Sequence, residues 1–109
     1  MKIISYVLCS LLLFDTTSYA NECVVASHYH QGKYTTSGER MNANAMTAAH
    51  KTLPFGTLIT VTNPYNQKKV VVRINDRGPF IRGRHLDLTT GAARIISMRG
   101  VQTVCISYK

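Results

Sequence analysis

The sequence predicts a small, mainly β fold with one short helix. Short segments alternate between apolar and polar residues, as half-buried strands do, and turn-forming residues separate them. Only one segment, near the C-terminus, carries apolar residues at helical spacing. In a chain of 109 residues this pattern fits a small β-barrel or an α+β domain.

The first expected elements are a strand, a loop and a hairpin. Residues 23–29 are strand-like, and the polar residues 30–44 form a loop. Residues 57–62 alternate with a period near two, residues 63–67 form a turn, and residues 68–75 return as a strand. The last three segments together predict a β-hairpin.

The C-terminal part predicts a strand, a helix and a final strand. Residues 85–88 form the short strand, Thr89 can cap the following helix, and Gly100 is expected to end it. The helix is expected to turn inward Ala92, Ile95 and Ile96. Residues 101–108 form the last strand, and its pairing with the first strand would close a barrel without exposed edges.

Residues 1–20 predict a secretory signal peptide that is cleaved after Ala20. The segment has a basic start, and its apolar run over residues 3–14 is shorter than the roughly 20 residues that span a bilayer. No other segment is a candidate for a membrane span. Neither Cys9 nor Cys23 directly follows a small residue, as a lipid-modified cysteine does. We therefore expect an exported protein, periplasmic or secreted, without a lipid anchor.

Residues 21–109 predict one domain, because they contain no internal repeat, low-complexity tract or linker. Removing 20 of 109 residues leaves 89, which form only a thin core. Cys23 and Cys105 lie near the two ends of this domain, and export favours disulfides, so we expect them to be bonded. The alternative is a pair of buried thiols. A monomer is the default expectation.

The domain is strongly basic. Without the signal peptide the chain keeps 12 of 13 Lys and Arg and 4 of 5 Asp and Glu, a formal net charge of +8, so an anionic partner is expected. Nucleic acid is not expected, since an exported protein meets little of it and no aromatic and basic platform is evident. Cell-wall polymer or anionic lipid headgroups fit better. Four cations are interpreted as solvated surface charges: Lys68, Lys69, Arg94 and Arg99.

The most informative segment is Asn-Asp-Arg-Gly-Pro-Phe at residues 75–80, directly after an apolar strand. It places the carboxylate of Asp76 at a strand end before a rigid Gly-Pro turn. Carboxylates are scarce in the domain. Two other polar segments, residues 35–40 and 47–57, each add one proton-handling side chain, Glu39 and His50. The pattern predicts that these segments assemble into one site.

Structural roles compete with catalytic ones at each position. Asp76 can cap its turn through an Asx hydrogen bond, Glu39 can be a solvated loop charge, and His50 can be a hydrogen-bonded core histidine. Asp87, between two leucines, is expected to be structural and to bond backbone amides near the helix start.

The histidines offer a metal site as a further alternative. His28 and His30 share a strand face, and His50 or His85 can join them. No Cys pair or His-Glu helix signature accompanies them, so neither a metal nor another cofactor is expected.

Six segments, read together, are similar to one known family. They are Ala-Ser-His-Tyr at 26–29, Thr-Ser-Gly-Glu at 36–39, Ala-Met-Thr-Ala-Ala-His at 45–50, Leu-Pro-Phe-Gly-Thr at 53–57, Val-Val-Arg-Ile-Asn-Asp-Arg-Gly-Pro-Phe at 71–80 and Leu-Asp-Leu at 86–88. In order and spacing they resemble the RlpA-like (rare lipoprotein A) family. The resemblance implies a six-stranded double-psi β-barrel. It also implies a septal lytic transglycosylase that cuts peptidoglycan glycan strands and prefers those without stem peptides.

The resemblance also implies roles for the candidate residues, with Asp76 as general acid/base. In the lytic reaction the 6-hydroxyl of the sugar attacks its own anomeric carbon and leaves a 1,6-anhydro end, so no water or enzymatic nucleophile is needed. One carboxylate can then act as acid and base in turn. Glu39 and His50 are expected to tune the proton affinity of Asp76 or to hold the substrate.

Phe80, Tyr29 and Arg77 are the expected substrate contacts. Phe80 offers a sugar-stacking face, and Tyr29 can line a glycan groove with Tyr34 and Tyr65, although packing roles suit the tyrosines equally. Arg77 is expected to point away from the neighbouring carboxylate, toward wall polymer or backbone carbonyls, because a close cation would favour the ionised carboxylate.

Two rival functions stay open from the sequence. An expansin-like module would bind the wall polymer through the same groove without cutting it. A basic protein acting on anionic lipid surfaces would bind in a way that salt abolishes and that ignores Asp76.

Overall fold

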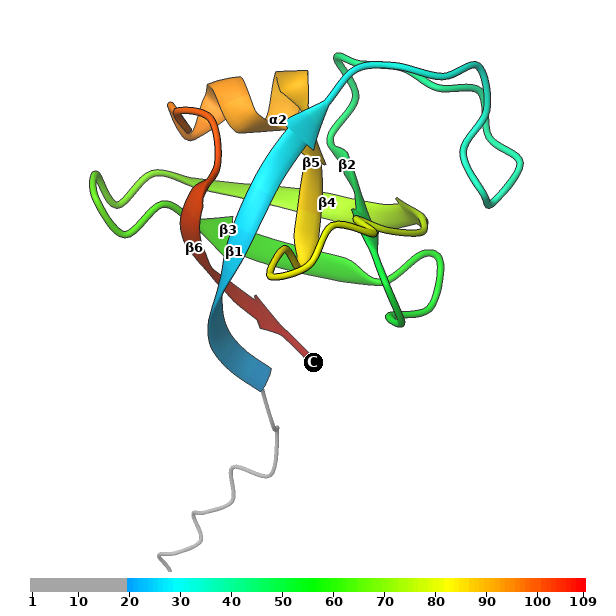
Figure 1. Ribbon diagram of the computed structural model, residues 1–109. Helices are drawn as coiled ribbons and strands as arrows, with labels where there is room; N and C mark the ends of the chain where they lie inside the picture. Colours follow the sequence, from blue (N-terminus) through cyan, green and yellow to red (C-terminus); the bar gives the residue numbers. More distant parts are fainter. Residues whose placement is uncertain (1–19) are drawn as a thin grey trace, which may run out of the picture.

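The computed structural model describes residues 20–109, which form six strands and one short helix (Figure 1). Residues 1–19, the greater part of the predicted signal peptide, lie outside the described residues. The elements are β1 (Ala20–Tyr29), β2 (Thr47–His50), β3 (Leu58–Thr62), β4 (Lys69–Asp76), β5 (Leu86–Thr89), α2 (Thr90–Ile95) and β6 (Gln102–Tyr108). The predicted hairpin, now β3 and β4, is confirmed within one residue at each end.

The strands form a closed barrel in the order β1-β5-β2-β4-β3-β6. Two of the pairings are parallel, β1 with β5 and β2 with β4, and each joins segments far apart in the sequence. The antiparallel pairing of β1 with β6 closes the barrel, so the C-terminus lies beside the start of β1 (Figure 1). Closure leaves no unpaired sheet edge, which is the arrangement expected from the sequence.

Alternation along the hairpin strands explains which side chains fill the barrel. Val70 and Val72 are buried, whereas Val71 between them is 52% exposed. Ile59 and Val61 are likewise buried, and Leu58 before them faces solvent. Each fully buried aliphatic side chain contributes about 1.5 to 3 kcal/mol to stability. The period-two pattern of the sequence is therefore the pattern of the core.

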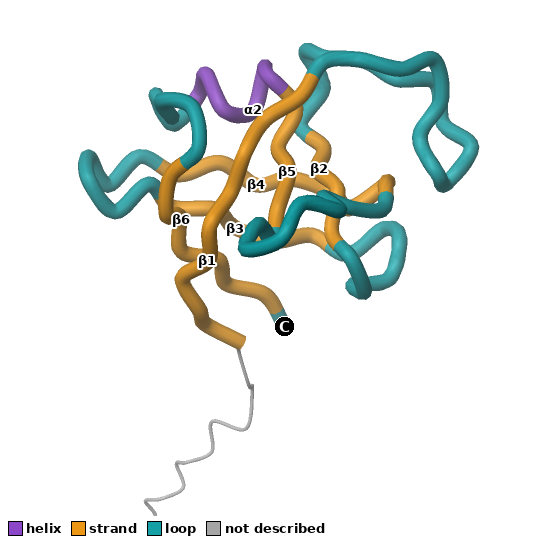
Figure 2. Tube along the Cα trace, in the orientation of Figure 1, coloured by secondary structure: helices purple, strands orange, loops and turns teal. Residues whose placement is uncertain are grey.

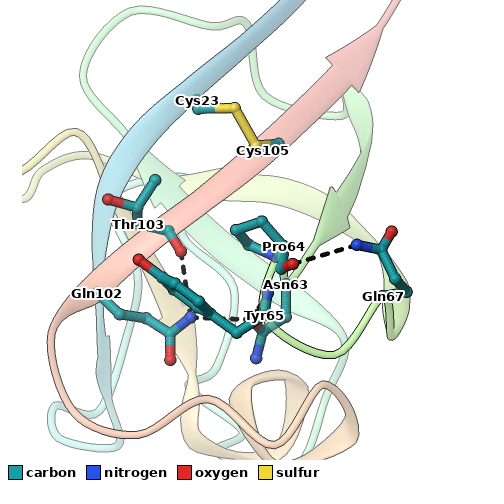
Figure 3. Close-up of a disulfide and its surroundings, with 8 residues drawn as sticks. All are labelled: Cys23, Asn63, Pro64, Tyr65, Gln67, Gln102, Thr103 and Cys105. Atoms are coloured by element: carbon teal, nitrogen blue, oxygen red, sulfur yellow. Dashed lines mark hydrogen bonds between the residues drawn. A yellow bond between two sulfur atoms is a disulfide. The ribbon is translucent and has the colours of Figure 1, made fainter.

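A disulfide joins Cys23 on β1 to Cys105 on β6, which confirms the predicted pair (Figure 3). The two residues are direct neighbours in the antiparallel register. Close by, Gln102 donates to the side-chain oxygen of Asn63 at 3.1 Å, and the buried Asn63 amide donates to the Ile96 carbonyl at 2.9 Å. The barrel seam, the β3–β4 turn and the end of the helix are thus bonded together.

The helix begins as predicted but ends earlier. The Thr89 hydroxyl accepts a hydrogen bond from the Ala92 amide, which is an N-cap. The helix ends at Ile95, before Ser97 adopts a left-handed backbone with φ of 52°, so the prediction that it continues to Gly100 was wrong. The inward prediction was also wrong for Ile95, which is 53% exposed, because the buried face of the segment runs through Ala92, Ala93 and Ile96 instead.

One strand was not predicted. β2, with the sequence Thr-Ala-Ala-His, lies between β4 and β5 and pairs with both. Its small residues carry little strand propensity, so its conformation comes from its two neighbours. β2 lies in the barrel wall between the two strands that carry Asp76 and Asp87.

Candidate functional site

The candidate site lies where β4 ends. The pairing of β4 with β2 shifts register between Ala48 and Ala49, and this shift places Asp76 opposite Ala49. Such irregularities re-aim a side chain next to a site. After Asp76 the chain turns through a cis Gly78–Pro79 peptide, with φ of 119° at Gly78, and exposes Phe80. The predicted turn geometry is therefore present.

Asp76 accepts hydrogen bonds from two other segments of the chain. Its Oδ1 accepts from the Thr36 amide at 2.8 Å, from the Thr36 hydroxyl at 2.8 Å and from the Arg77 amide at 2.9 Å. Its Oδ2 accepts from the Tyr29 hydroxyl at 3.0 Å. The carboxylate therefore joins the ends of β1 and β4 to the loop between β1 and β2. A residue that only capped its own turn would not make these bonds to distant segments. Because Oδ2 has only this one bond, it keeps acceptor capacity for a substrate.

The pKa of Asp76 lies below its ordinary value. Partial burial raises the pKa, but the hydrogen bonds from Thr36, Arg77 and Tyr29 outweigh it because they favour the ionised form. The pKa of Tyr29 is raised, first by burial and then by the charge of Asp76, so the tyrosine remains a neutral donor. At neutral pH Asp76 is therefore an ionised carboxylate that accepts a hydrogen bond from the neutral phenol of Tyr29.

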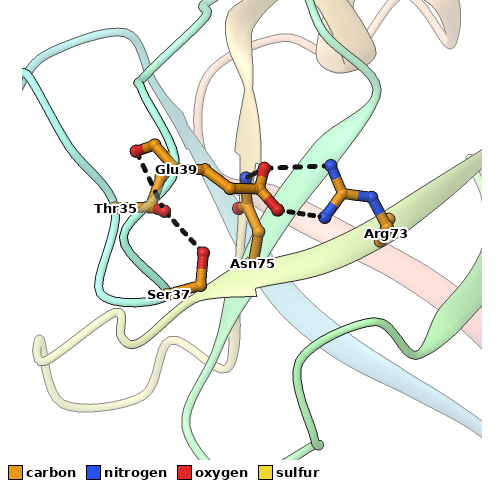
Figure 4. A network of polar contacts seen from close by, with 5 residues as sticks. All are labelled: Thr35, Ser37, Glu39, Arg73 and Asn75. Carbon is orange, nitrogen blue, oxygen red and sulfur yellow. Dashed lines mark hydrogen bonds and ion pairs between the residues drawn. The ribbon is translucent and has the colours of Figure 1, made fainter.

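The loop between β1 and β2 projects from the barrel (Figure 2) and carries a short hairpin, residues 33–41, which is hydrogen-bonded to β4. Glu39 in this hairpin forms a two-pronged ion pair with Arg73 of β4, one arm being 2.9 Å long, and accepts from the Asn75 amide at 3.0 Å (Figure 4). The Ser37 amide also donates to the Asn75 carbonyl at 3.3 Å. These bonds hold the hairpin in the position from which Thr36 reaches Asp76.

Glu39 is held in its ionised form. Hydrogen bonds from Arg73 and then from Asn75 lower the pKa of Glu39 to about 2. The structure therefore brings Glu39 to the predicted site, where its carboxylate is ion-paired with Arg73. The Oδ1 atom of Asn75 is buried and has no hydrogen-bond partner among the described residues.

His50 ends β2 with its ring turned to the following turn. Its Nδ1 accepts from the amides of Thr52 at 3.1 Å and Leu53 at 3.0 Å, so a neutral ring carries its proton on Nε2. Burial is the main cause that lowers the pKa of His50, and the ring is neutral at pH 7. No hydrogen bond joins the His50 ring to Asp76 in the described part of the chain. The carbonyl of His50 does connect to the site, since it accepts from Arg77 at 3.2 Å.

Arg77 points away from Asp76, as predicted. Its guanidinium donates to the carbonyls of His50 and, at 2.9 Å, of Leu53, and it lies over the Phe55 ring at 4.1 Å from the centroid. Arg77 therefore stabilises the segment after β2 by hydrogen bonds to its carbonyls. Phe80 is 82% exposed and free to meet a ligand, as its predicted role requires.

Asp87 lies in the same row of residues as Asp76, which its expected structural role did not include. Ala49 pairs with Asp76 on one side and with Asp87 on the other, and Asp87 pairs in turn with Ser27. These four residues form a row across β4, β2, β5 and β1. With about 4.8 Å between strands, the Cα atoms of the two aspartates are about 10 Å apart. We call this row, together with Tyr29, the carboxylate row.

Asp87 differs from Asp76 in its surroundings. It accepts from the Ser27 hydroxyl at 3.1 Å, not from the backbone amides that were expected. Burial is the main cause that raises the pKa of Asp87, with a further contribution from the negative charge of Asp76. The environments thus push the pKa values of the two carboxyls in opposite directions, which is typical of acid and base pairs in enzymes. Sequence spacing could not reveal this, because it depends on which strands are neighbours.

Residues 20–109 contain no cluster of three or more His, Cys, Asp and Glu side chains arranged to hold a metal ion. Within the same residues, no helix is long and apolar enough to cross a membrane.

Comparisons with known proteins agree on one family. A family model described as "Lytic transglycolase" matches residues 21–108. A protein of Nostoc sp. named "Probable endolytic peptidoglycan transglycosylase RlpA" is 58% identical over 81 residues, which cover 70% of this chain and 22% of the relative. The "Endolytic peptidoglycan transglycosylase RlpA" of Pasteurella multocida is 51% identical over 89 residues, covering 79% of this chain and 30% of the relative. The chain thus spans less than a third of the length of these relatives.

Solved structures agree on the fold. The Streptomyces papain inhibitor superposes with a TM-score of 0.64 at 18% identity, covering 82% of this chain and 93% of that one. An expansin of Clavibacter michiganensis superposes with a TM-score of 0.63 at 21% identity, covering 80% of this chain and 49% of that one. Together with the closed barrel of six strands, these likenesses confirm the predicted double-psi β-barrel.

Proposed function

Since the chain belongs to the lytic transglycolase family, whose model matches residues 21–108, we propose that it is an endolytic peptidoglycan transglycosylase. It cleaves β-1,4 glycan strands, preferring strands without stem peptides, and leaves 1,6-anhydromuramoyl ends. The observation that carries the proposal is the carboxylate row, in which Asp76 and Asp87 stand on either side of Ala49. Relatives with the printed name of this activity support the substrate class.

The reaction needs a proton donor for the leaving oxygen and an acceptor for the attacking hydroxyl. Asp87, whose pKa is raised, protonates the glycosidic oxygen as the bond from the anomeric carbon breaks. The ionised Asp76 accepts the proton of the 6-hydroxyl as its oxygen bonds to the same carbon. The negative charge of Asp76 also stabilises the oxocarbenium-like transition state. The single acid/base role expected for Asp76 is thereby shared between two carboxyls.

Glu39 and His50 act indirectly in this proposal. Glu39 holds the 33–41 hairpin to Arg73, so that Thr36 keeps Asp76 ionised and in place. His50 supports the turn that Arg77 braces. Phe80 and Tyr29 are proposed to contact sugar rings, Phe80 by stacking and Tyr29 by lining the groove.

The protein is proposed to work outside the cytoplasm, in the periplasm or beyond. Its substrate lies there, and the Cys23–Cys105 disulfide fits an oxidising compartment. The predicted signal peptide of residues 1–20 would provide the route.

The experiment that tests the function is mass spectrometry of sugars released from peptide-free glycan strands. The unchanged protein is expected to release anhydro-ended sugars. Asp76→Asn and Asp87→Asn are each expected to slow release by about a hundredfold or more, the usual contribution of a proton-transferring group. Glu22→Gln removes an exposed carboxylate outside the row and serves as the matched control.

Each outcome decides between the candidate functions. Products from the control but not from the aspartate variants support the proposal. Binding of strands without any product would instead favour the expansin-like module. Binding that salt abolishes and that neither aspartate variant changes would favour the lipid-surface protein.

A further inference from the structure

A depression lies on the stem of the 33–41 hairpin, apart from the carboxylate row. It has a volume of about 360 Å³ and is lined by Gly32, Lys33, Tyr34, Arg40 and Met41. This volume is within the range of about 300 to 1,000 Å³ in which small ligands bind. No role in the reaction described above uses these side chains.

The backbone keeps the walls of the depression together. The Met41 amide donates to the Lys33 carbonyl at 2.8 Å, and Tyr34 and Arg40 form a β-bridge. The Tyr34 side chain is 67% exposed. An aromatic ring is therefore presented on an ordered backbone, as a stacking surface for a sugar requires.

The depression is cationic and its charges are unpaired. Lys33 and Arg40 form no ion pair among residues 20–109. The nearest acidic residue in sequence, Glu39, is bonded to Arg73, while Arg40 lines the depression. Two cations beside an exposed aromatic ring are suited to a ligand with an anionic group on a ring.

The depression is also close to the reacting groups. Thr36, which bonds Asp76 at 2.8 Å, follows Tyr34 by two residues, so the Cα atoms of Tyr34 and Thr36 are at most about 7 Å apart. A glycan strand lying along the row can therefore place a neighbouring sugar against Tyr34.

We propose that this depression is a subsite for a carboxylate-bearing sugar, namely a muramoyl unit whose lactyl carboxylate is free. Lys33 and Arg40 bind the carboxylate, and Tyr34 packs against the ring. A stem peptide would convert this carboxylate to an amide and remove the charge that the subsite binds. This inference rests on the proposed function, because it takes peptidoglycan glycan as the ligand.

The test is calorimetric titration with four ligands in the Asp76→Asn background, which prevents turnover. The ligands are peptide-free glycan strands, the same strands with lactyl carboxylates converted to methylamides, strands with stem peptides, and chitin oligosaccharides of matched length. The free-carboxylate strands are expected to bind about fivefold to tenfold more tightly than the other three, as one charge-assisted contact provides.

Two double variants with equal loss of charge separate the subsite from general electrostatics. Lys33→Met/Arg40→Gln is expected to remove the preference and leave chitin binding unchanged. Lys69→Met/Arg99→Gln loses the same charge at exposed positions outside the depression and is expected to keep the preference. Thermal unfolding verifies that both doubles fold.

Equal binding of the free and amidated strands would overturn the inference. An equal loss of the preference in both double variants would overturn it as well. Tight, Lys33-dependent binding of strands with stem peptides would show that a peptide carboxylate is bound instead. Cleavage is measured separately on the unchanged protein. Discriminating binding without cleavage would overturn only the proposed function, and cleavage without discrimination would overturn only the subsite.

Discussion

The bond between Glu39 and Arg73 gives the sharpest test of how the site is organised. If Glu39 acts only by holding the 33–41 hairpin against β4, then Glu39→Gln and Arg73→Met should have the same effect on activity. If Glu39 transfers a proton, only its own replacement should matter. The two variants therefore separate a positioning role from a catalytic one.

The size of the effect follows from the exposure of the pair. Both side chains are 41% exposed, so solvent screening limits the ion pair to the upper part of the 0.2 to 1 kcal/mol range of exposed pairs, about 1 kcal/mol. That energy corresponds to about a fivefold change in the ratio of docked to undocked hairpin. Each single variant is expected to lower kcat/KM by up to about fivefold, and the double variant by about the same factor, because both replacements remove the same ion pair.

The assay is the initial rate of release of anhydro-ended sugars, with the free energy of unfolding of all four proteins measured in urea. The pKa of Glu39, lowered to about 2, adds a pH dependence. The stability from this pair is present above the ordinary carboxyl pKa of about 4 and is lost as the pH falls toward 2. A loss of more than a hundredfold in Glu39→Gln, with Arg73→Met nearly unaffected, would refute the reasoning and make Glu39 a proton carrier.

Three further predictions concern the disulfide, the helix and the tyrosine. Replacing Cys23 and Cys105 by serine is expected to lower the free energy of unfolding by about 4 to 5 kcal/mol, the loop-closure value for 82 residues, and an unchanged urea midpoint would contradict this. Gly91→Ala places a Cβ only 2.8 Å from the backbone of the loop before β2, so a loss of about 1 to 3 kcal/mol and a lower Tm are expected; an unaltered Tm would show that the loop gives way without cost. Tyr29→Phe removes a hydrogen bond that favours ionised Asp76, so the pKa of Asp76 rises and the acid limb of the rate profile should move to higher pH; a shift in the other direction would contradict the assigned role.

The sequence predicted those parts of the fold that depend on local pattern. The β3–β4 hairpin follows from strict alternation around a turn, and the N-cap at Thr89 follows from a hydroxyl before an apolar helical stretch. β2 was missed because Ala48 and Ala49 have no local preference for a strand and are held by β4 and β5. Ile95 was misplaced because helical spacing allowed either Ala93 or Ile95 to face inward beside Ala92 and Ile96, and the structure buries Ala93.

The same distinction applies to the site. Asp76 was found from its turn motif, and the direction of Arg77 was found from the electrostatic cost of a cation beside an acid. The position of Asp87 depends on two strand pairings between distant segments, and no local signal carries that information. The partner of Glu39 was equally hidden, because Arg73 lies 34 residues away.

Whether the attacking oxygen comes from the sugar or from water can be measured by cleaving peptide-free glycan strands in water enriched with heavy oxygen. Products with 1,6-anhydro ends and without heavy oxygen are expected, because the attacking oxygen comes from the sugar itself. Reducing ends that carry heavy oxygen would show hydrolysis by water, and would contradict the proposed roles of Asp76 and Asp87 in an intramolecular attack.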